Sequence, residues 1–123
     1  IFQVDADETL AHALEENVHS LLLDNSETEL FLVPRVNIVN GITQEDIKKW
    51  GWAQNEKGWN MWPDFQTRIF KNTKNIRWQG NVHERIVGYK TWAHLPEEER
   101  WSLYHIKDVE RQRSQNELYR TIV

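Results

Sequence analysis

Two closely spaced aspartates near the start of the chain are the residues best suited to chemistry. Asp5 and Asp7 follow the apolar run 1–4 (IFQV), which has the character of a short buried strand. Side chains two residues apart on a strand share a face, so both carboxylates are expected to point the same way at its end. Two carboxylates so close repel each other unless a cation lies between them. The pair therefore predicts a site for Mg²⁺ or Mn²⁺ shared with a substrate phosphate, because these ions prefer oxygen ligands.

Two other interpretations of this segment compete with a metal site. Asp7 could cap the next helix, because an aspartate at an N-cap accepts hydrogen bonds from free backbone N–H groups. A calcium loop would place Asp5, Asp7 and Glu16 at its first, third and twelfth positions. That loop is excluded, because its sixth position requires glycine for a sharp turn and Leu10 stands there.

The composition describes one globular domain over residues 1–123, with 39% hydrophobic and 28% charged residues. The net charge of −4 argues against general nucleic-acid binding, which requires a basic surface. No apolar stretch reaches the ~20 residues of a membrane-spanning helix, so no membrane span is expected. The chain has no cysteine, which excludes disulfides and thiolate metal sites and is compatible with a cytoplasmic location.

The spacing of apolar residues predicts an α/β fold. Helices are predicted over 8–24, 43–50 and 108–122, and strands over 1–4, 29–39, 65–70, 76–78 and 82–87, with a further short apolar run at 101–106. Residues 71–75 have the composition of a hairpin loop, and Pro34 indicates a strand edge or a bulge. Residues 51–63 contain three tryptophans without a clear period and are predicted to form a long ordered loop, a kind of segment that often carries function.

Five short strings occur in an order that resembles a family of glycosyltransferases. They are Asp5-Ala6-Asp7-Glu8, Pro34-Arg35-Val36-Asn37, Trp62–Phe70 (WPDFQTRIF), Gly80–Glu84 (GNVHE) and Leu103–Lys107 (LYHIK). Together they are similar to family 2 glycosyltransferases of the GT-A fold, and most to the short members carried by tailed phages. The resemblance covers nearly the whole chain and implies a GT-A-like mixed sheet flanked by helices.

The resemblance also implies that a part of the domain lies upstream. Family members begin with a nucleotide-binding βαβ half that ends at the D-x-D strand, where this chain begins. The chain is therefore expected to be the metal motif plus the C-terminal, acceptor-side portion of the domain. The strand 1–4 would then have an uncovered edge. Two outcomes are expected: either a second copy of the chain or another polypeptide covers this edge, or the edge lies exposed beside Asp5.

The activity implied is a metal-dependent, inverting transfer of a sugar from a UDP- or GDP-sugar donor to a saccharide hydroxyl. The resemblance makes Asp7 the direct metal ligand and lets Asp5 contact the ribose, or the metal through water. It places the catalytic base at Asp64, directly after the Trp-rich loop, with Glu84 as the alternative carboxylate. A turn aspartate after proline is the structural alternative for Asp64.

Further site residues follow from the same strings. His105 is expected as an additional metal ligand, with His83 as the alternative, although each could be a hydrogen-bonded structural histidine. Lys107 is expected to meet the donor diphosphate. Gln66 and Arg68 alternate with apolar neighbours on their strand and should face the cleft or solvent, where Arg68 could contact the donor and Gln66 the acceptor.

The seven tryptophans divide into two groups. Sugars present apolar C–H faces that stack on indole, so a Trp-rich loop beside a carboxylate suits a saccharide acceptor. The tryptophans expected at the acceptor are Trp50, Trp52, Trp59 and Trp62, although several could be core residues that cap the sheet. The tryptophans expected in the core are Trp78, Trp92 and Trp101.

Two other functions compete with transfer. A non-catalytic carbohydrate-binding module would use the tryptophans alone and would not need the D-x-D motif or Asp64. A metal-dependent phosphohydrolase would need more carboxylates and histidines converging on the metal than the sequence offers.

Overall fold

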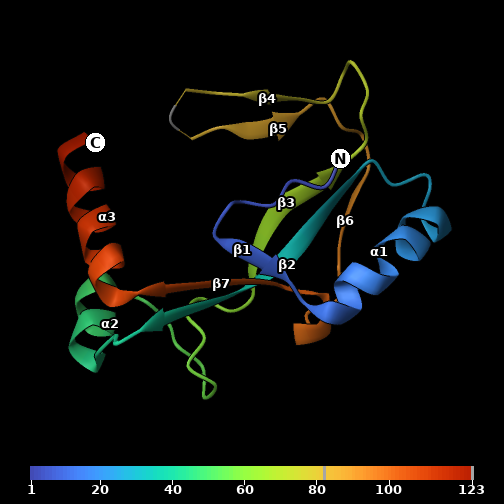
Figure 1. Ribbon diagram of the computed structural model, residues 1–123. Helices are drawn as coiled ribbons and strands as arrows, with labels where there is room; N and C mark the ends of the chain where they lie inside the picture. Colours follow the sequence, from blue (N-terminus) through green and yellow to red (C-terminus); the bar gives the residue numbers. More distant parts are fainter. Residues whose placement is uncertain (82, 123) are drawn as a thin grey trace.

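A computed structural model describes residues 1–81 and 83–122 and shows a mixed sheet with three α-helices (Figure 1). This arrangement confirms the predicted α/β class. The elements in chain order are β1 Glu8–Leu10, α1 His12–Asp24, β2 Leu30–Asn40, α2 Gln44–Trp50, β3 Asp64–Phe70, β4 Arg77–Gln79, β5 Arg85–Val87, β6 Trp92–His94, a 3₁₀ turn at Glu99–Trp101, β7 Leu103–Asp108 and α3 Val109–Ile122.

The main sheet has the strand order β1-β7-β2-β3, and β6 also pairs with β2. β2 runs parallel to β6 and β7 and antiparallel to β3, while β1 is antiparallel to β7. β2 and β7 therefore point the same way and both end beside α2 and α3, which stand together at one end of the molecule (Figure 1). An ion pair of 2.7 Å between Asp46 of α2 and Arg113 of α3 joins the two helices.

The central strand β2 supplies both the core and the site. Phe31 and Val33 pack in the main hydrophobic core with Leu14 of α1 and Leu103 of β7. Residues two apart share a face of a strand, so the same face continues with polar residues toward the end of β2. Because Val33 is held in the core, the side chains at alternate positions after it are held on the same face of the sheet.

Pro34 lies in this central strand, so the predicted strand edge is wrong, whereas the alternative prediction of a bulge agrees with a register shift between Phe31 and Leu32. On one side it pairs with Phe65 of β3. On the other side β6 ends opposite Leu32 and β7 begins opposite Arg35. Proline is tolerated here because it falls in the gap between two successive neighbouring strands, where a missing N–H disrupts no ladder.

The N-terminal segment differs from its prediction. In place of a strand over 1–4, Phe2 makes a single antiparallel bridge to Ile69 on the outer edge of β3. Residues 4–7, named here the crossing segment, then pass over the sheet to reach β7, where β1 pairs (Figure 1). The predicted helix start at Glu8 is therefore wrong: Glu8–Leu10 is a strand, and α1 begins at His12. Self-association through this edge stays a prediction.

The predicted hairpin across residues 71–75 is also wrong. β3 pairs with β2, and β4 pairs instead with β5, which begins at Arg85. A second core of Leu30, Phe70, Ile76 and Ile86 holds this small hairpin against the main sheet. Val82, where the predicted strand began, lies outside the described residues.

Other predictions are confirmed. Helix α2 begins after the N-cap Thr43, whose hydroxyl accepts the Asp46 N–H while the Asp46 carboxylate accepts the Thr43 N–H. α3 also agrees with its prediction within a residue, and residues 51–63 form the expected loop. Within the described part of the chain, no helix is both long and apolar enough to cross a membrane.

The core prediction for three tryptophans holds for one of them. Trp101 packs partly buried against the main core. Trp78 and Trp92 are 40% and 59% exposed, so their expected burial is wrong. Each lies on a three-residue strand, which is too short to cover a side chain of this size with its own neighbours.

Candidate functional site

One face of the sheet gathers polar side chains from three strands. Arg35 and Asn37 follow Val33 on β2, and His105 and Lys107 follow Leu103 on β7 at the same alternation. The parallel register places Asn37 beside His105. Asp64, the first residue of β3, pairs with Arg35 from the other side. The alternation of side chains along β2 and β7 therefore places these polar residues on the same face of the sheet as the core residues that precede them.

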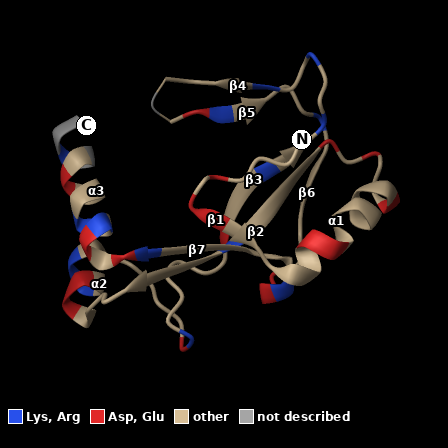
Figure 2. Cartoon of the chain, viewed as in Figure 1, with Lys and Arg blue, Asp and Glu red and all other residues tan. Residues whose placement is uncertain are grey.

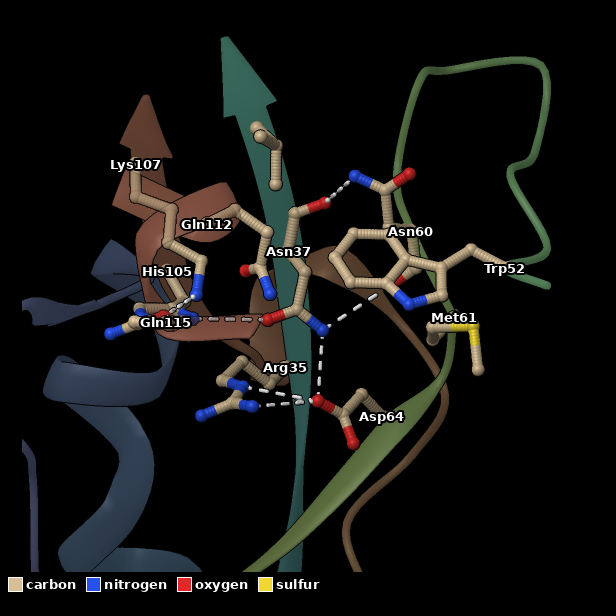
Figure 3. A pocket seen from close by; sticks show the side chains of 11 residues that line it. Arg35, Asn37, Trp52, Asn60, Met61, Asp64, His105, Lys107, Gln112 and Gln115 are labelled. Carbon is tan, nitrogen blue, oxygen red and sulfur yellow. Dashed lines mark hydrogen bonds and ion pairs between the residues drawn. The ribbon is translucent and has the colours of Figure 1, made fainter. Parts of the chain in front are cut away.

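These side chains surround a cavity of about 330 Å³, named here the Asp64 pocket (Figure 3). Its size falls within the range of small-molecule sites, about 300–1,000 Å³. It is lined by Arg35, Asn37, Val39, Trp52, Asn60, Met61, Asp64, His105, Lys107, Gln112 and Gln115. Such a lining of amides, one indole and charged groups suits a ligand rich in hydroxyl groups.

Asp64 uses its two carboxylate oxygens unequally. Oδ2 accepts hydrogen bonds from Arg35 Nε at 3.1 Å and Nη2 at 2.9 Å, and from Asn37 Nδ2 at 2.8 Å. Oδ1 accepts a single bond of 2.8 Å from Gln66. A carboxylate oxygen has about two acceptor sites. Oδ1 can therefore accept a further hydrogen bond, whereas the acceptor sites of Oδ2 are already occupied.

His105 connects this pocket with the crossing segment. Its Nε2 lies 2.9 Å from Asp7 Oδ2, and its Nδ1 lies 3.2 Å from Asn37 Oδ1. Arg111 of α3 reaches the same Asp7 oxygen at 3.2 Å. The hydrogen bond with His105 is the main reason that the pKa of Asp7 lies below its usual value.

A fully buried carboxylate joins the strands beneath the crossing segment. Glu8 Oε2 accepts hydrogen bonds of 2.9 Å from both Arg35 and Arg68, and its Oε1 accepts the backbone N–H of Asp5 at 3.0 Å. Arg68 also binds both oxygens of Asp5, at 3.0 and 3.1 Å. In Figure 2 the red acidic stretch that leads into β1 lies beside β3, which carries a blue basic position. An alternating chain of charges, Asp5–Arg68–Glu8–Arg35–Asp64, thus runs under the site.

Lys107 lies at the helix side of the pocket and donates a 2.8 Å hydrogen bond to Gln115 of α3. Burial lowers the pKa of Lys107, and the nearby positive charges of Arg111 and Arg35 lower it further. Arg35 is ion-paired with Glu8 and Asp64, and Arg111 with Asp7, whereas Lys107 bonds the neutral Gln115. Lys107 is therefore the cation of the pocket lining that is best placed to meet an anionic ligand.

The Trp-rich loop contributes mainly one ring. Trp52 lines the pocket, and Trp50 packs beside it at 5.0 Å between ring centroids. Trp59 is only 7% exposed and packs edge-on against Trp62, so this pair supports the loop. Asn60 fixes the loop to β2, because its backbone N–H donates to the Asn37 carbonyl at 2.9 Å. Of the four predicted acceptor tryptophans, Trp52 therefore has the most direct access to Asp64.

Several predicted residues lie elsewhere. Glu84, Gln66 and Arg68 line a second cleft on the other side of Asp64. His83 is exposed in the connection between β4 and β5. The structure thus brings Asp64, Asp7, His105 and Lys107 together and leaves His83 and Glu84 apart from them.

Several residues at the site have no role assigned from sequence, among them Glu8, Arg35, Asn37 and Arg111. Arg35 and Asn37 carry a usable signal, because two polar residues at alternate positions in an apolar strand must share a face. Glu8 and Arg111 carry none, since their partners are distant in the sequence.

The fit of a divalent cation can be tested on these contacts. Asp7 Oδ2 and His105 Nε2 lie 2.9 Å apart, and neighbouring ligands of an octahedral Mg²⁺ at about 2.1 Å lie about 3 Å apart. The Nδ1 of His105 faces Asn37, which leaves Nε2 as the nitrogen for a metal. Asp5 is engaged by Arg68 instead. Among residues 1–81 and 83–122, no three histidine, aspartate or glutamate side chains form a ready metal group. The chain thus offers two ligands and leaves the others to a substrate and water.

Comparisons of the chain with models of known protein families, with curated proteins and with solved structures give no match.

Proposed function

We propose that the chain carries the acceptor-side site of a metal-dependent, inverting glycosyltransferase of the GT-A type. The donor is a nucleotide-diphosphate sugar and the acceptor is a saccharide hydroxyl. The observation that supports this best is the Asp64 pocket, where a carboxylate, an indole, a histidine–aspartate pair and cationic groups meet around one cavity. The lack of cysteine fits the cytoplasm as the compartment of this activity.

Asp64 acts as the general base through Oδ1, the oxygen that keeps acceptor capacity. The acceptor hydroxyl oxygen attacks the anomeric carbon and forms the new C–O bond while the bond to the diphosphate oxygen breaks. The hydroxyl proton passes to Asp64, and the leaving group departs as a nucleoside diphosphate. Attack from the side opposite the leaving group inverts the anomeric centre.

The leaving group develops negative charge, and the cationic end of the pocket lies ready to stabilise it. Lys107 and Arg111 supply positive charge from β7 and α3. Asp7 and His105 would hold Mn²⁺ or Mg²⁺, which supplies further neutralisation of the diphosphate. Arg111 would exchange its contact with Asp7 for one with the phosphate.

One observation favours a second function, saccharide binding without transfer. Asp64 is held in a fixed position by its ion pair with Arg35 and by hydrogen bonds from Asn37 and Gln66, as a purely ligand-binding carboxylate would be. Such a group is well suited to bind sugar hydroxyls. The two functions differ in whether the site recognises a nucleoside diphosphate with a metal.

Calorimetry of Mn²⁺ binding with and without UDP or GDP separates the two functions. Transfer predicts that the nucleotide strengthens Mn²⁺ binding, because two protein ligands leave most of the metal shell open. Asp7→Ala should abolish this gain, while Asp24→Ala, an exposed carboxylate at the end of α1, should leave it unchanged. Equal Mn²⁺ binding by the wild type and Asp7→Ala under both conditions would refute the metal site.

The base is tested in a polypeptide that also carries a nucleotide-binding half. Asp64→Asn should reduce transfer by about 10²–10⁴-fold, the usual contribution of a general base, while nucleotide binding stays nearly intact. A loss below tenfold would show that Asp64 is not the base.

A further inference from the structure

A second cavity of about 390 Å³ lies beside the Asp64 pocket, between β3 and the β4–β5 hairpin. It is named here the Trp78 cleft, and its walls include Gln66, Arg68, Trp78, Glu84 and Arg85. Its volume is that of a small-molecule site. The mechanism above uses none of these residues directly.

Trp78 offers an exposed ring on a fixed support. It is 40% exposed and stands on β4, where it pairs with Ile86, a residue of the second core. Its ring packs edge-on against Phe70 at 6.4 Å between centroids, and this contact restrains the indole. A restrained, exposed indole in a polar cleft suits the apolar C–H face of a sugar ring.

The residues around Trp78 carry planar hydrogen-bonding groups, and their positive and negative charges are equal in number. The lining includes two guanidinium groups, Arg68 and Arg85, and two carboxylates, Asp5 and Glu84, of which Arg68 and Asp5 are hydrogen-bonded to each other. Planar groups of this kind bind pairs of neighbouring hydroxyls. The balance of charge favours an uncharged sugar over one that carries a carboxylate or phosphate.

The two cavities meet at one hydrogen bond. Gln66 lines the Trp78 cleft and donates at 2.8 Å to Asp64 Oδ1, the oxygen proposed to accept the proton. A saccharide whose reacting hydroxyl lies at Asp64 therefore continues along β3 into the Trp78 cleft.

We infer that the Trp78 cleft binds an uncharged sugar residue next to the reacting one, so that the acceptor is an oligosaccharide of at least two units. This inference rests on the proposed function for the identity of the reacting end. It assigns Gln66 as the residue that contacts both units and Trp78 as the stacking surface.

The test is ¹⁹F NMR of the 123-residue chain labelled with 5-fluorotryptophan, with each resonance assigned by a Trp→Phe variant. The probes are cellobiose, lactose and chitobiose, with the matching monosaccharides and glucuronic acid. At least one disaccharide should shift the Trp78 resonance saturably and bind at least tenfold more tightly than its monosaccharide. The resonance of Trp92, which is exposed outside the cleft, should stay unchanged.

Variants make the test specific. Trp78→Ala and Gln66→Ala should each weaken disaccharide binding at least tenfold, and Trp92→Ala should not. Trp78→Phe keeps an aromatic ring in the cleft and should bind with an intermediate affinity. The fold of each variant is checked by its remaining fluorotryptophan resonances.

The failures of the two proposals are distinguishable. No Trp78 shift with any probe, or a shift of Trp52 alone that survives Trp78→Ala, overturns the inference and leaves the proposed function in place. Equal shifts of Trp78 and Trp92 indicate non-specific contact and also overturn it. A saturable Trp78 shift in a chain whose Mn²⁺ binding is the same with and without UDP or GDP supports the cleft and counts against the metal site at Asp7 and His105.

Discussion

Replacing Glu8 by glutamine tests the buried charge network at its centre. The Glu8 carboxylate is fully buried and lies 2.9 Å from the guanidinium groups of both Arg35 and Arg68. Glu8→Gln keeps the shape of the side chain but removes the negative charge that both arginines share. It also leaves a terminal N–H₂ group among cationic donors, where it finds no acceptor.

The size of the effect follows from what each arginine keeps. Breaking a buried ion pair by removing one partner costs about 3–5 kcal/mol. Arg35 keeps Asp64 at 2.9 Å, and Arg68 keeps Asp5 at 3.0 Å. These remaining partners place the expected loss of unfolding free energy near the lower end, at about 3 kcal/mol. With an m-value of about 1.5 kcal/mol/M, the urea midpoint falls by about 2 M.

Urea unfolding at pH 7, followed by tryptophan fluorescence, measures this loss. Glu98→Gln is the matched control, because Glu98 pairs with Arg100 at the surface and such a pair contributes about 0–1 kcal/mol. If Glu8→Gln lost less than about 1 kcal/mol, or no more than the control, the buried network would not stabilise the fold as reasoned.

Three further perturbations test other parts of the fold. Gly88→Ala should destabilise the chain at least twice as much as Gly51→Ala in thermal unfolding. A Cβ at position 88 would lie 1.6 Å from a backbone carbonyl oxygen, whereas a Cβ at position 51 would have nothing within 4 Å. Equal losses of stability in the two variants would contradict the close approach at Gly88. The pKa of Asp7 is lowered mainly by its hydrogen bond with His105, so Asp7 adds stability above its unfolded pKa that is lost as the pH falls toward the folded value. Asp7→Asn should therefore flatten the decline of unfolding free energy with acid below about pH 5, and an unchanged decline would refute this. Burial and a hydrogen bond to a carboxylate raise the pKa of Tyr104 to about 12, so an ultraviolet titration should show one phenol ionising there that disappears in Tyr104→Phe.

The sequence predicted those elements whose signals are local. The capping box at Thr43 and the apolar run 29–39 are such signals, and the structure has helix α2 and strand β2 there, each within a residue of its prediction. Which strand pairs with which is not a local signal, because it depends on residues that are distant in the sequence. β4 and β5 have three residues each, and their pairing depends on a second core that joins residues distant in the sequence. The helical spacing from Leu10 onward extended the predicted α1 too far, because pairing with β7 competes for Glu8–Leu10.

The candidate site was predictable to a similar degree. Asp64, His105 and Lys107 meet in one pocket because strand alternation carries them to one face. Asp5 was expected to share the face of Asp7, but residues 5–7 turn rather than extend, so one carboxylate reaches Arg68 and the other His105. The turn arises because the segment has to cross from one strand to another, which local periodicity does not encode.

The crossing segment, residues 4–7, should not tolerate the insertion of a residue. It is tied at one end by the bridge from Phe2 to β3 and at the other by β1 on β7, so its length is set by the width of the sheet beneath it. Inserting one residue would force one of the two ends to slip by a position. A slip of one residue turns side chains to the opposite face, which would take Glu8 from between its arginines into solvent. A stretch that looks like an ordinary surface loop therefore tolerates changes of side chain far better than changes of length.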